Sequence, residues 1–175
     1  LAHELVKKNI NRKVIYLAVL LHDIAKGRPE DHSVAGARIA RRLGPRLGFT
    51  RTETDLTEWL VREHLIMSDV AQRRDLSDPQ TIRDFADKVQ TLERLRHLLV
   101  LTVIDIRAVG PGVWNGWKGQ LLRELYFEAE ADLMGSASHT NRPSRVAYAK
   151  ESFIEAYRAR DKKISLKACE AYITR

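Results

Sequence analysis

The chain has 175 residues, of which 44% are hydrophobic and 30% charged, and its formal net charge is +7 at pH 7. These values are typical of one globular domain with a real core, and no apolar run is long enough to span a membrane, so a membrane partner is not expected. The single cysteine, Cys169, excludes an intramolecular disulfide and a thiolate metal cluster, and it favours a cytoplasmic location. The basic excess favours an anionic partner, such as a nucleotide, a nucleic acid or an acidic protein surface.

Helical periodicity dominates the chain and predicts an all-α fold. The first helix is predicted over residues 12–26, with Gly27 as its C-terminal cap. It is apolar almost all the way round, which is typical of a central, buried helix. His22 and Asp23 interrupt this apolar surface, and burying them costs free energy unless each has a partner. That partner is a divalent metal, or else a buried arginine, a backbone carbonyl or an ordered water.

The next two helices are predicted over residues 31–45 and 53–67, the second of them capped by Thr52. His32 lies nine residues after Asp23, so the chain returns at this point towards the end of the first helix. His64 follows Leu60 by four residues and continues an apolar stripe. Taken alone, His32 is typical of a surface histidine beside a turn, and His64 of a core histidine bonded to the backbone.

Three further helices are predicted: one from about residue 80, one over residues 92–109 and one over residues 118–134. Asp105 is an isolated carboxylate in the strongly apolar helix over 92–109, where an unpaired buried charge costs about 3–5 kcal/mol. We therefore expect Asp105 to have a metal or a basic partner. Arg107 is close in sequence but points elsewhere on a helix.

The candidate site residues share one ligand chemistry, since imidazole and carboxylate suit Mn, Fe, Zn or Mg. They are His22, Asp23, His32, His64 and Asp105. Their order resembles that of the HD-domain metal-dependent phosphohydrolases, an all-helical superfamily that hydrolyses phosphate esters at one or two metal ions. Several segments, in the same order, are similar to the HD domain of the bifunctional uridylyltransferase/uridylyl-removing enzymes. These segments are Leu20–Arg28, Asp31–Ser33, Trp59–Leu65, Met67–Ser68, Ala71–Leu76, Asp105–Ala108 and Trp114–Lys118.

The resemblance implies a helical bundle around a central metal site. It implies removal of UMP from a uridylylated tyrosine of the PII nitrogen-regulatory protein. The metal that it implies is Mn or Mg, with Fe or Zn as alternatives. His22, Asp23 and Asp105 match the core metal ligands. His32 and His64 match positions that hold a second ion in related members, and Asp23 could bridge the two ions.

The resemblance also suggests residues for catalysis and substrate binding. Asp23 and Lys26 are the expected catalytic residues. Lys26 lies one turn after His22 and is expected to bind a phosphate oxygen, the alternative being a solvated lysine favoured by the helix dipole. Arg73 and Arg107 are further phosphate-binding candidates, with a surface or structural arginine as the alternative for each.

Residues 1–135 are expected to form the HD domain, 136–144 a surface connection, and 145–175 C-terminal helices that lead towards a following domain. The superfamily's first histidine ligand lies on an upstream helix. The one histidine before His22 is His3, in a segment that does not match that motif, so we expect the chain to begin after that ligand.

Two other functions stay open. One is an HD phosphohydrolase that acts on a free nucleotide or an alarmone. The other is a non-catalytic helical module that binds a partner through its basic surface. Nucleic acid is disfavoured because the arginines are scattered over several helices and form no single groove-binding element.

Overall fold

The computed structural model describes residues 1–8, 10–110 and 112–135. Within these residues the predicted all-α fold is confirmed, with helices and no strand. The helices are α1 (Ala2–Lys8), α2 (Arg12–Leu21), α3 (His32–Arg46), α4 (Arg51–Arg62), α5 (Ile66–Arg73), α6 (Pro79–Val89), α7 (Leu92–Ala108) and α8 (Gly116–Leu133). None of these described helices is long and apolar enough to cross a membrane. The predictions for residues 136–144 and 145–175 lie outside the described residues.

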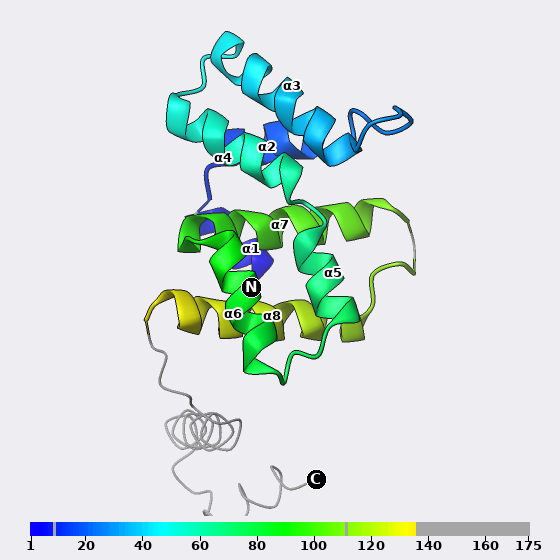
Figure 1. Cartoon of the computed structure of the whole chain (residues 1–175), viewed down its shortest axis with the longest axis vertical. Coiled ribbons are helices and arrows are strands. Elements are labelled where there is room, and N and C mark those ends of the chain that lie inside the picture. Colours follow the sequence, from blue (N-terminus) through cyan, green and yellow to red (C-terminus); the bar gives the residue numbers. More distant parts are fainter. Residues whose placement is uncertain (9, 111, 136–175) are drawn as a thin grey trace, which may run out of the picture. The chain divides into compact units, whose positions relative to one another are not determined.

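Helix α7 is the central support of the described residues. It packs against α1, α2, α4, α5, α6 and α8. Helices α2, α3 and α4 lie on one side of it, and α5, α6 and α8 lie on the other (Figure 1). Its leucines at positions 95, 98, 99 and 101 are each at most 2% exposed. Because a fully buried leucine contributes about 1.5–3 kcal/mol, this helix is a rigid base for side chains at its C-terminal end.

The start of α7 is joined to the start of α2 by His97, a histidine whose role the sequence pattern does not predict. His97 is buried, its Nε2 accepts a hydrogen bond from the Asn11 N–H at 3.1 Å, and its Nδ1 donates to the Glu93 carbonyl at 2.7 Å. The buried site lowers the pKa of His97, because desolvation disfavours the charged ring. His97 is therefore a structural residue and lies apart from the candidate ligands.

Several predicted helix starts are confirmed and one cap was wrong. Asp31 caps α3 and Asp78 caps α6, each by accepting backbone N–H bonds at the helix start. The cap of α4 is Thr50 and not Thr52. Thr50 Oγ1 accepts from the Glu53 N–H at 3.2 Å, and the Glu53 carboxylate accepts from the Thr50 N–H at 2.9 Å. This reciprocal pair is a capping box, which satisfies two otherwise unpaired donors.

The helix predicted over residues 12–26 ends early, at Leu21. The His22 N–H still bonds to the Ala18 carbonyl four residues back, at 2.9 Å. The N–H groups of Ile24 and Lys26 instead bond three residues back, to Leu21 and Asp23, and Gly27 closes the turn with φ +84°. Because of this change in hydrogen bonding, His22 and Asp23 lie on the turn that ends the helix and not within it. On such a turn, two successive side chains can point towards a common site.

The helix predicted over residues 53–67 is also interrupted. Helix α4 ends at Arg62 and α5 begins at Ile66, so His64 lies on the turn between them. The Ile66 N–H bonds three residues back, to the Glu63 carbonyl at 3.0 Å. Two of the histidines predicted to lie within helices thus follow helix ends.

These two helix ends approach each other at Gly36 of α3. A Cβ atom at this position would lie 3.1 Å from the Leu21 carbonyl oxygen and 3.0 Å from Val61 Cγ1. Leu21 directly precedes His22, and Val61 lies three residues before His64. The missing side chain of Gly36 therefore sets how closely the two histidine-bearing turns pack.

We expect Gly36→Ala to lower the free energy of unfolding by about 1–3 kcal/mol, because a backbone oxygen must move to admit the methyl group. Urea unfolding measures this change. Gly116→Ala is the matched control, since nothing lies within 4 Å of the Cβ that it would add. Equal stability of the two variants would contradict the close packing at Gly36.

Candidate metal centre

The structure brings all five predicted ligands together at the ends of helices. His22 and Asp23 lie on the turn after α2, His32 is the first residue of α3, and His64 lies on the turn between α4 and α5. Asp105 lies in the last turn of α7. His64 is 2% exposed and the other four are partly exposed, so the centre is closed on the His64 side and open on another.

His22 and His64 are oriented by the same local hydrogen bond. Each ring places Nδ1 2.8 Å from the carbonyl oxygen three residues earlier, Val19 for His22 and Val61 for His64. A carbonyl oxygen only accepts, so Nδ1 carries the proton and the Nε2 lone pair of the neutral ring is free. This is the arrangement that metal-binding histidines commonly have.

The two oxygens of Asp23 face different partners. Oδ2 lies 3.4 Å from His22 Nε2 and also accepts from Lys26 Nζ. Oδ1 lies 3.7 Å from His32 Nε2 and 3.8 Å from His64 Nε2. Oδ1 is buried, and the described residues offer it no hydrogen bond. A buried carboxylate oxygen without a donor is costly, so the protein alone leaves this atom unsatisfied.

The candidate ligands form two groups that share Asp23. One is Asp23, His32 and His64, the other is His22, Asp23 and Asp105, and within each group the ligand atoms lie within 4.8 Å of one another. In the second group, His22 Nε2 lies 3.4 Å from Asp105 Oδ1. Separations of 3.4–3.8 Å are longer than a hydrogen bond. They are close to the spacing of about 3.0–3.4 Å between two ligands of one ion with bonds of about 2.1 Å. The residues therefore fit a divalent metal.

Charges within the centre shift the pKa values of His22 and Asp105 in opposite directions. The Asp105 carboxylate raises the pKa of His22, and His22 in turn lowers the pKa of Asp105. Burial lowers the pKa of His64, which keeps that ring neutral. Because a ligand histidine must be neutral, a metal that binds His22 has to displace any proton held there, and its affinity is expected to rise with pH.

Lys26 lies at the solvent edge of the centre. Its side chain is 66% exposed and pairs with Asp23 Oδ2, which raises the pKa of the lysine. The ammonium group is therefore charged, beside the candidate ligands and accessible to a substrate.

The structure does not bring Arg73, Arg107 or His3 into the centre. Arg73 ends α5, about 10 Å along the helix axis from the residues that follow His64, and pairs with Asp69 at 3.6 Å. Arg107 follows Asp105 by two residues, which turns it about 200° round the helix, and it lies 5.9 Å from the Trp114 ring. His3 lies exposed on α1.

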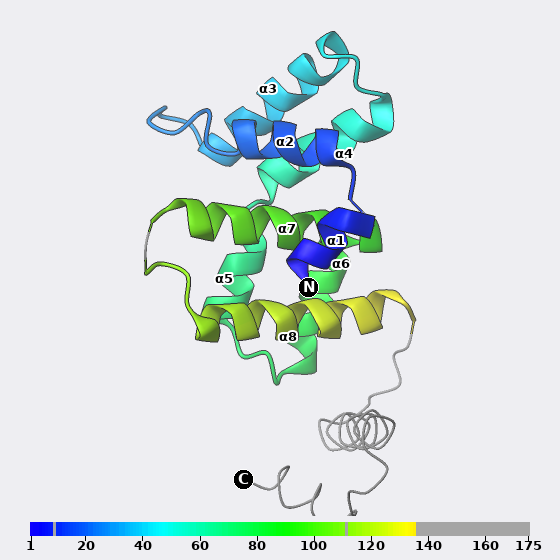
Figure 2. The ribbon, with the colours of Figure 1, turned by 180° about the vertical axis from the view of Figure 1, so that it is seen from behind.

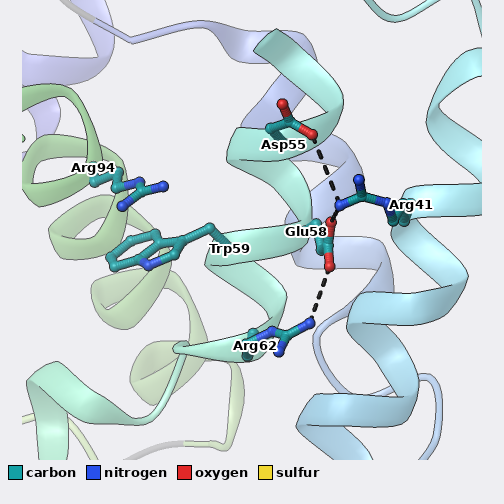
Figure 3. A pocket seen from close by; sticks show the side chains of 6 residues that line it. All are labelled: Arg41, Asp55, Glu58, Trp59, Arg62 and Arg94. Carbon is teal, nitrogen blue, oxygen red and sulfur yellow. Dashed lines mark hydrogen bonds and ion pairs between the residues drawn. The ribbon is translucent and has the colours of Figure 1, made fainter. Parts of the chain in front are cut away.

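A hollow of about 330 Å³ lies elsewhere, between α3, α4 and α7 (Figure 3). Glu58 accepts from Arg41 at 2.5 Å and from Arg62 at 3.0 Å, and the Arg94 guanidinium lies 4.9 Å from the Trp59 ring centre. None of the candidate metal ligands lines this hollow. Its ion pairs and its cation–π contact hold the three helices together.

Comparison with known proteins agrees with the geometry. The HD domain family matches residues 1–92, which include every candidate ligand except Asp105. The bifunctional uridylyltransferase/uridylyl-removing enzyme of Nitrobacter winogradskyi is 60% identical over 147 residues, which are 84% of this chain and 16% of that protein. The protein with the same description from Nitrobacter hamburgensis is 58% identical over 159 residues, 90% of this chain and 17% of that protein. The chain thus spans about a sixth of the length of these relatives. No solved structure matches it.

Added Mn²⁺ is expected to raise the melting temperature of the protein, because a ligand that binds only the folded state stabilises it by about 2.7 kcal/mol at a hundredfold excess over Kd. Asp23→Asn should remove most of this shift, since Asp23 belongs to both ligand groups. Arg73→Gln is the control and should keep it. A full Mn²⁺ shift in Asp23→Asn would show that the ion binds elsewhere.

Proposed function

We propose, from the premise that this chain belongs to the HD-domain family, that its centre hydrolyses a phosphodiester with the help of a divalent metal. HD domains are metal-dependent phosphohydrolases, and both relatives are described as uridylyl-removing as well as uridylyltransferase enzymes. Removal is a hydrolysis, and it suits a cluster of imidazole and carboxylate ligands. We therefore assign uridylyl removal, and not transfer, to these residues.

The observation that carries this proposal is the position of Asp23. Its two oxygens face two ligand groups, and one of them is buried without a hydrogen bond. His22, Asp23 and Asp105 would hold one ion, and Asp23, His32 and His64 a second. Mn or Mg is the metal we propose.

Each residue has a role in this chemistry. A divalent ion, when bound, supplies positive charge to the phosphoryl oxygens and makes water a better nucleophile. His22 and His64 present Nε2 because their Nδ1 protons are held by backbone carbonyls. Lys26 places an ammonium group at the open edge, where it can bind a phosphate oxygen.

The substrate we propose is the uridylylated tyrosine of PII, and the product is UMP. Water forms a new bond to phosphorus and releases a proton to the solvent, while the bond from phosphorus to the tyrosine oxygen breaks. The tyrosine leaves as a phenolate, whose conjugate acid has a pKa of about 10. Because this leaving group is more acidic than an ordinary alcohol, its departure needs little help from a general acid, and we assign none.

The direct test is UMP release from uridylylated PII by this chain with Mn²⁺ or Mg²⁺. Asp23→Asn should lower the rate at least about a thousandfold, because the metal supplies several kcal/mol of transition-state stabilisation. Arg73→Gln should stay within about twofold of the wild type, since Arg73 lies outside the centre. Turnover of free nucleotides or an alarmone, with no UMP released from PII, would instead support the alternative hydrolase.

Lys26→Ala is expected to lower kcat/KM for uridylylated PII by roughly 10- to 100-fold, the effect of losing one charge-assisted hydrogen bond of about 1.5–3 kcal/mol. Lys26→Arg should recover part of this loss, since it keeps the charge. An unchanged kcat/KM in Lys26→Ala would identify Lys26 as a solvated lysine with no contact to the phosphate.

A further inference from the structure

Exposed apolar side chains occur on the segments that carry the candidate metal ligands. We call this set the apolar border: it consists of Tyr16, Leu20, Ile24, Val34, Leu65 and Val109. Tyr16 is 70% exposed, Leu20 67% and Val109 69%. Single exposed apolar residues are normal on a protein surface, so the grouping of these six is what calls for an explanation.

The first three members lie on α2 and the turn that follows it. Tyr16 and Leu20 are four residues apart, so they share one face of the helix. Ile24 continues from them and is adjacent to Asp23 in the chain. Figure 2 shows α2 in front of α3 and α4, with its outer side not covered by any described helix. An apolar stripe therefore runs along α2 and ends at the candidate ligands.

The other three members lie beside ligands on other elements. Val34 follows His32 by two residues, and Leu65 is adjacent to His64. Val109 follows Asp105 by four residues with helical backbone angles, so it lies one turn further along the same face of α7. These three residues are therefore close to a candidate ligand along the chain.

The exposed charged residues along α2 and the turn after it, up to Arg28, are basic apart from the candidate ligand, and just beyond them Glu30 pairs with Arg38 while Asp31 caps α3. Between residues 12 and 28 the basic residues are Arg12, Lys13, Lys26 and Arg28, and the one acidic residue is the candidate ligand Asp23. The four basic residues are exposed. A partner that covers this face would therefore combine apolar side chains with negative charge.

We propose that the apolar border is the docking surface for the protein that carries the scissile phosphodiester. The partner is a polypeptide with apolar side chains and flanking acidic residues. This inference rests on the proposed function, because a phosphodiester on a tyrosine reaches the centre only if the protein around that tyrosine contacts the surface beside it. A free nucleotide needs the polar centre and Lys26, and gains little from a stripe that extends along α2 to Tyr16.

The test compares two substrates that share the same bond to UMP. One is uridylylated PII, and the other is the p-nitrophenyl ester of UMP, which carries no protein. Leu20→Ser and Val109→Ser are expected to raise KM for uridylylated PII at least about tenfold, the size of effect of central interface residues. Their kcat, and both constants for the small ester, should stay within about twofold of the wild type. Leu47→Ser is the matched control, because Leu47 is 54% exposed at the far end of α3.

The possible outcomes separate this proposal from the proposed function. If the wild type releases UMP and both variants have the wild-type KM for uridylylated PII, the docking surface is overturned and the proposed function stands. An equal fall in kcat/KM for both substrates would also overturn it, because the residues would then support the metal centre itself. A wild type that cleaves the small ester but not uridylylated PII would overturn the proposed function and, with it, this docking partner.

Binding without turnover gives an independent measurement. Wild-type protein treated with a chelator is expected to bind uridylylated PII, and Leu20→Ser is expected to weaken that binding by the same factor as it raises KM. Unchanged binding by Leu20→Ser would overturn the proposal.

Discussion

The carboxylate of Asp23 is the constraint on which the candidate centre depends. One of its oxygens is satisfied by Lys26, while the other is buried, faces the Nε2 atoms of His32 and His64, and has no hydrogen bond within the described part of the chain. Three imidazoles and a second carboxylate surround it. Such an arrangement is unfavourable as a purely structural feature, since the buried Oδ1 of Asp23 has no hydrogen-bond donor among the described residues. Its residues fit divalent cations, one in each of the two ligand groups that share Asp23.

Interrupted helices make this arrangement possible. The chain leaves α-helical hydrogen bonding after His22 and again after Glu63, and at these points His22 and His64 each have Nδ1 held by the carbonyl three residues back. That bond fixes the ring and leaves Nε2 free. A continuous helix would separate His22 and Asp23 by about 100° and would direct them to different neighbours. Gly36 lets the two interrupted ends approach closely, and the buried α7 holds Asp105 opposite them.

The same construction leaves the centre accessible. Ligands at helix ends lie near the surface, and only His64 is fully enclosed. Exposed apolar residues and exposed basic residues lie near these ligands along the chain, which is the basis of the docking surface proposed above. The residues that line the hollow at Arg41, Trp59 and Arg94 contribute to helix packing, and none of them is a candidate metal ligand.

The sequence by itself determined the helical class, the ranges of α3, α7 and α8 to within a few residues, the start of α6, and the residue types able to bind a metal. Hydrophobic periodicity and caps such as Asp31 and Asp78 are local, so they can be read from neighbouring residues. The role of the five ligands stays a prediction, but their grouping was expected from their shared chemistry. Only the tertiary structure decided where α2 and α4 end and which neighbour each Asp23 oxygen faces. It also showed that His97 is structural and that Arg73 pairs with Asp69. These features depend on contacts between residues far apart in the chain. Local periodicity cannot show where a helical backbone hydrogen bond is replaced so that such contacts can form.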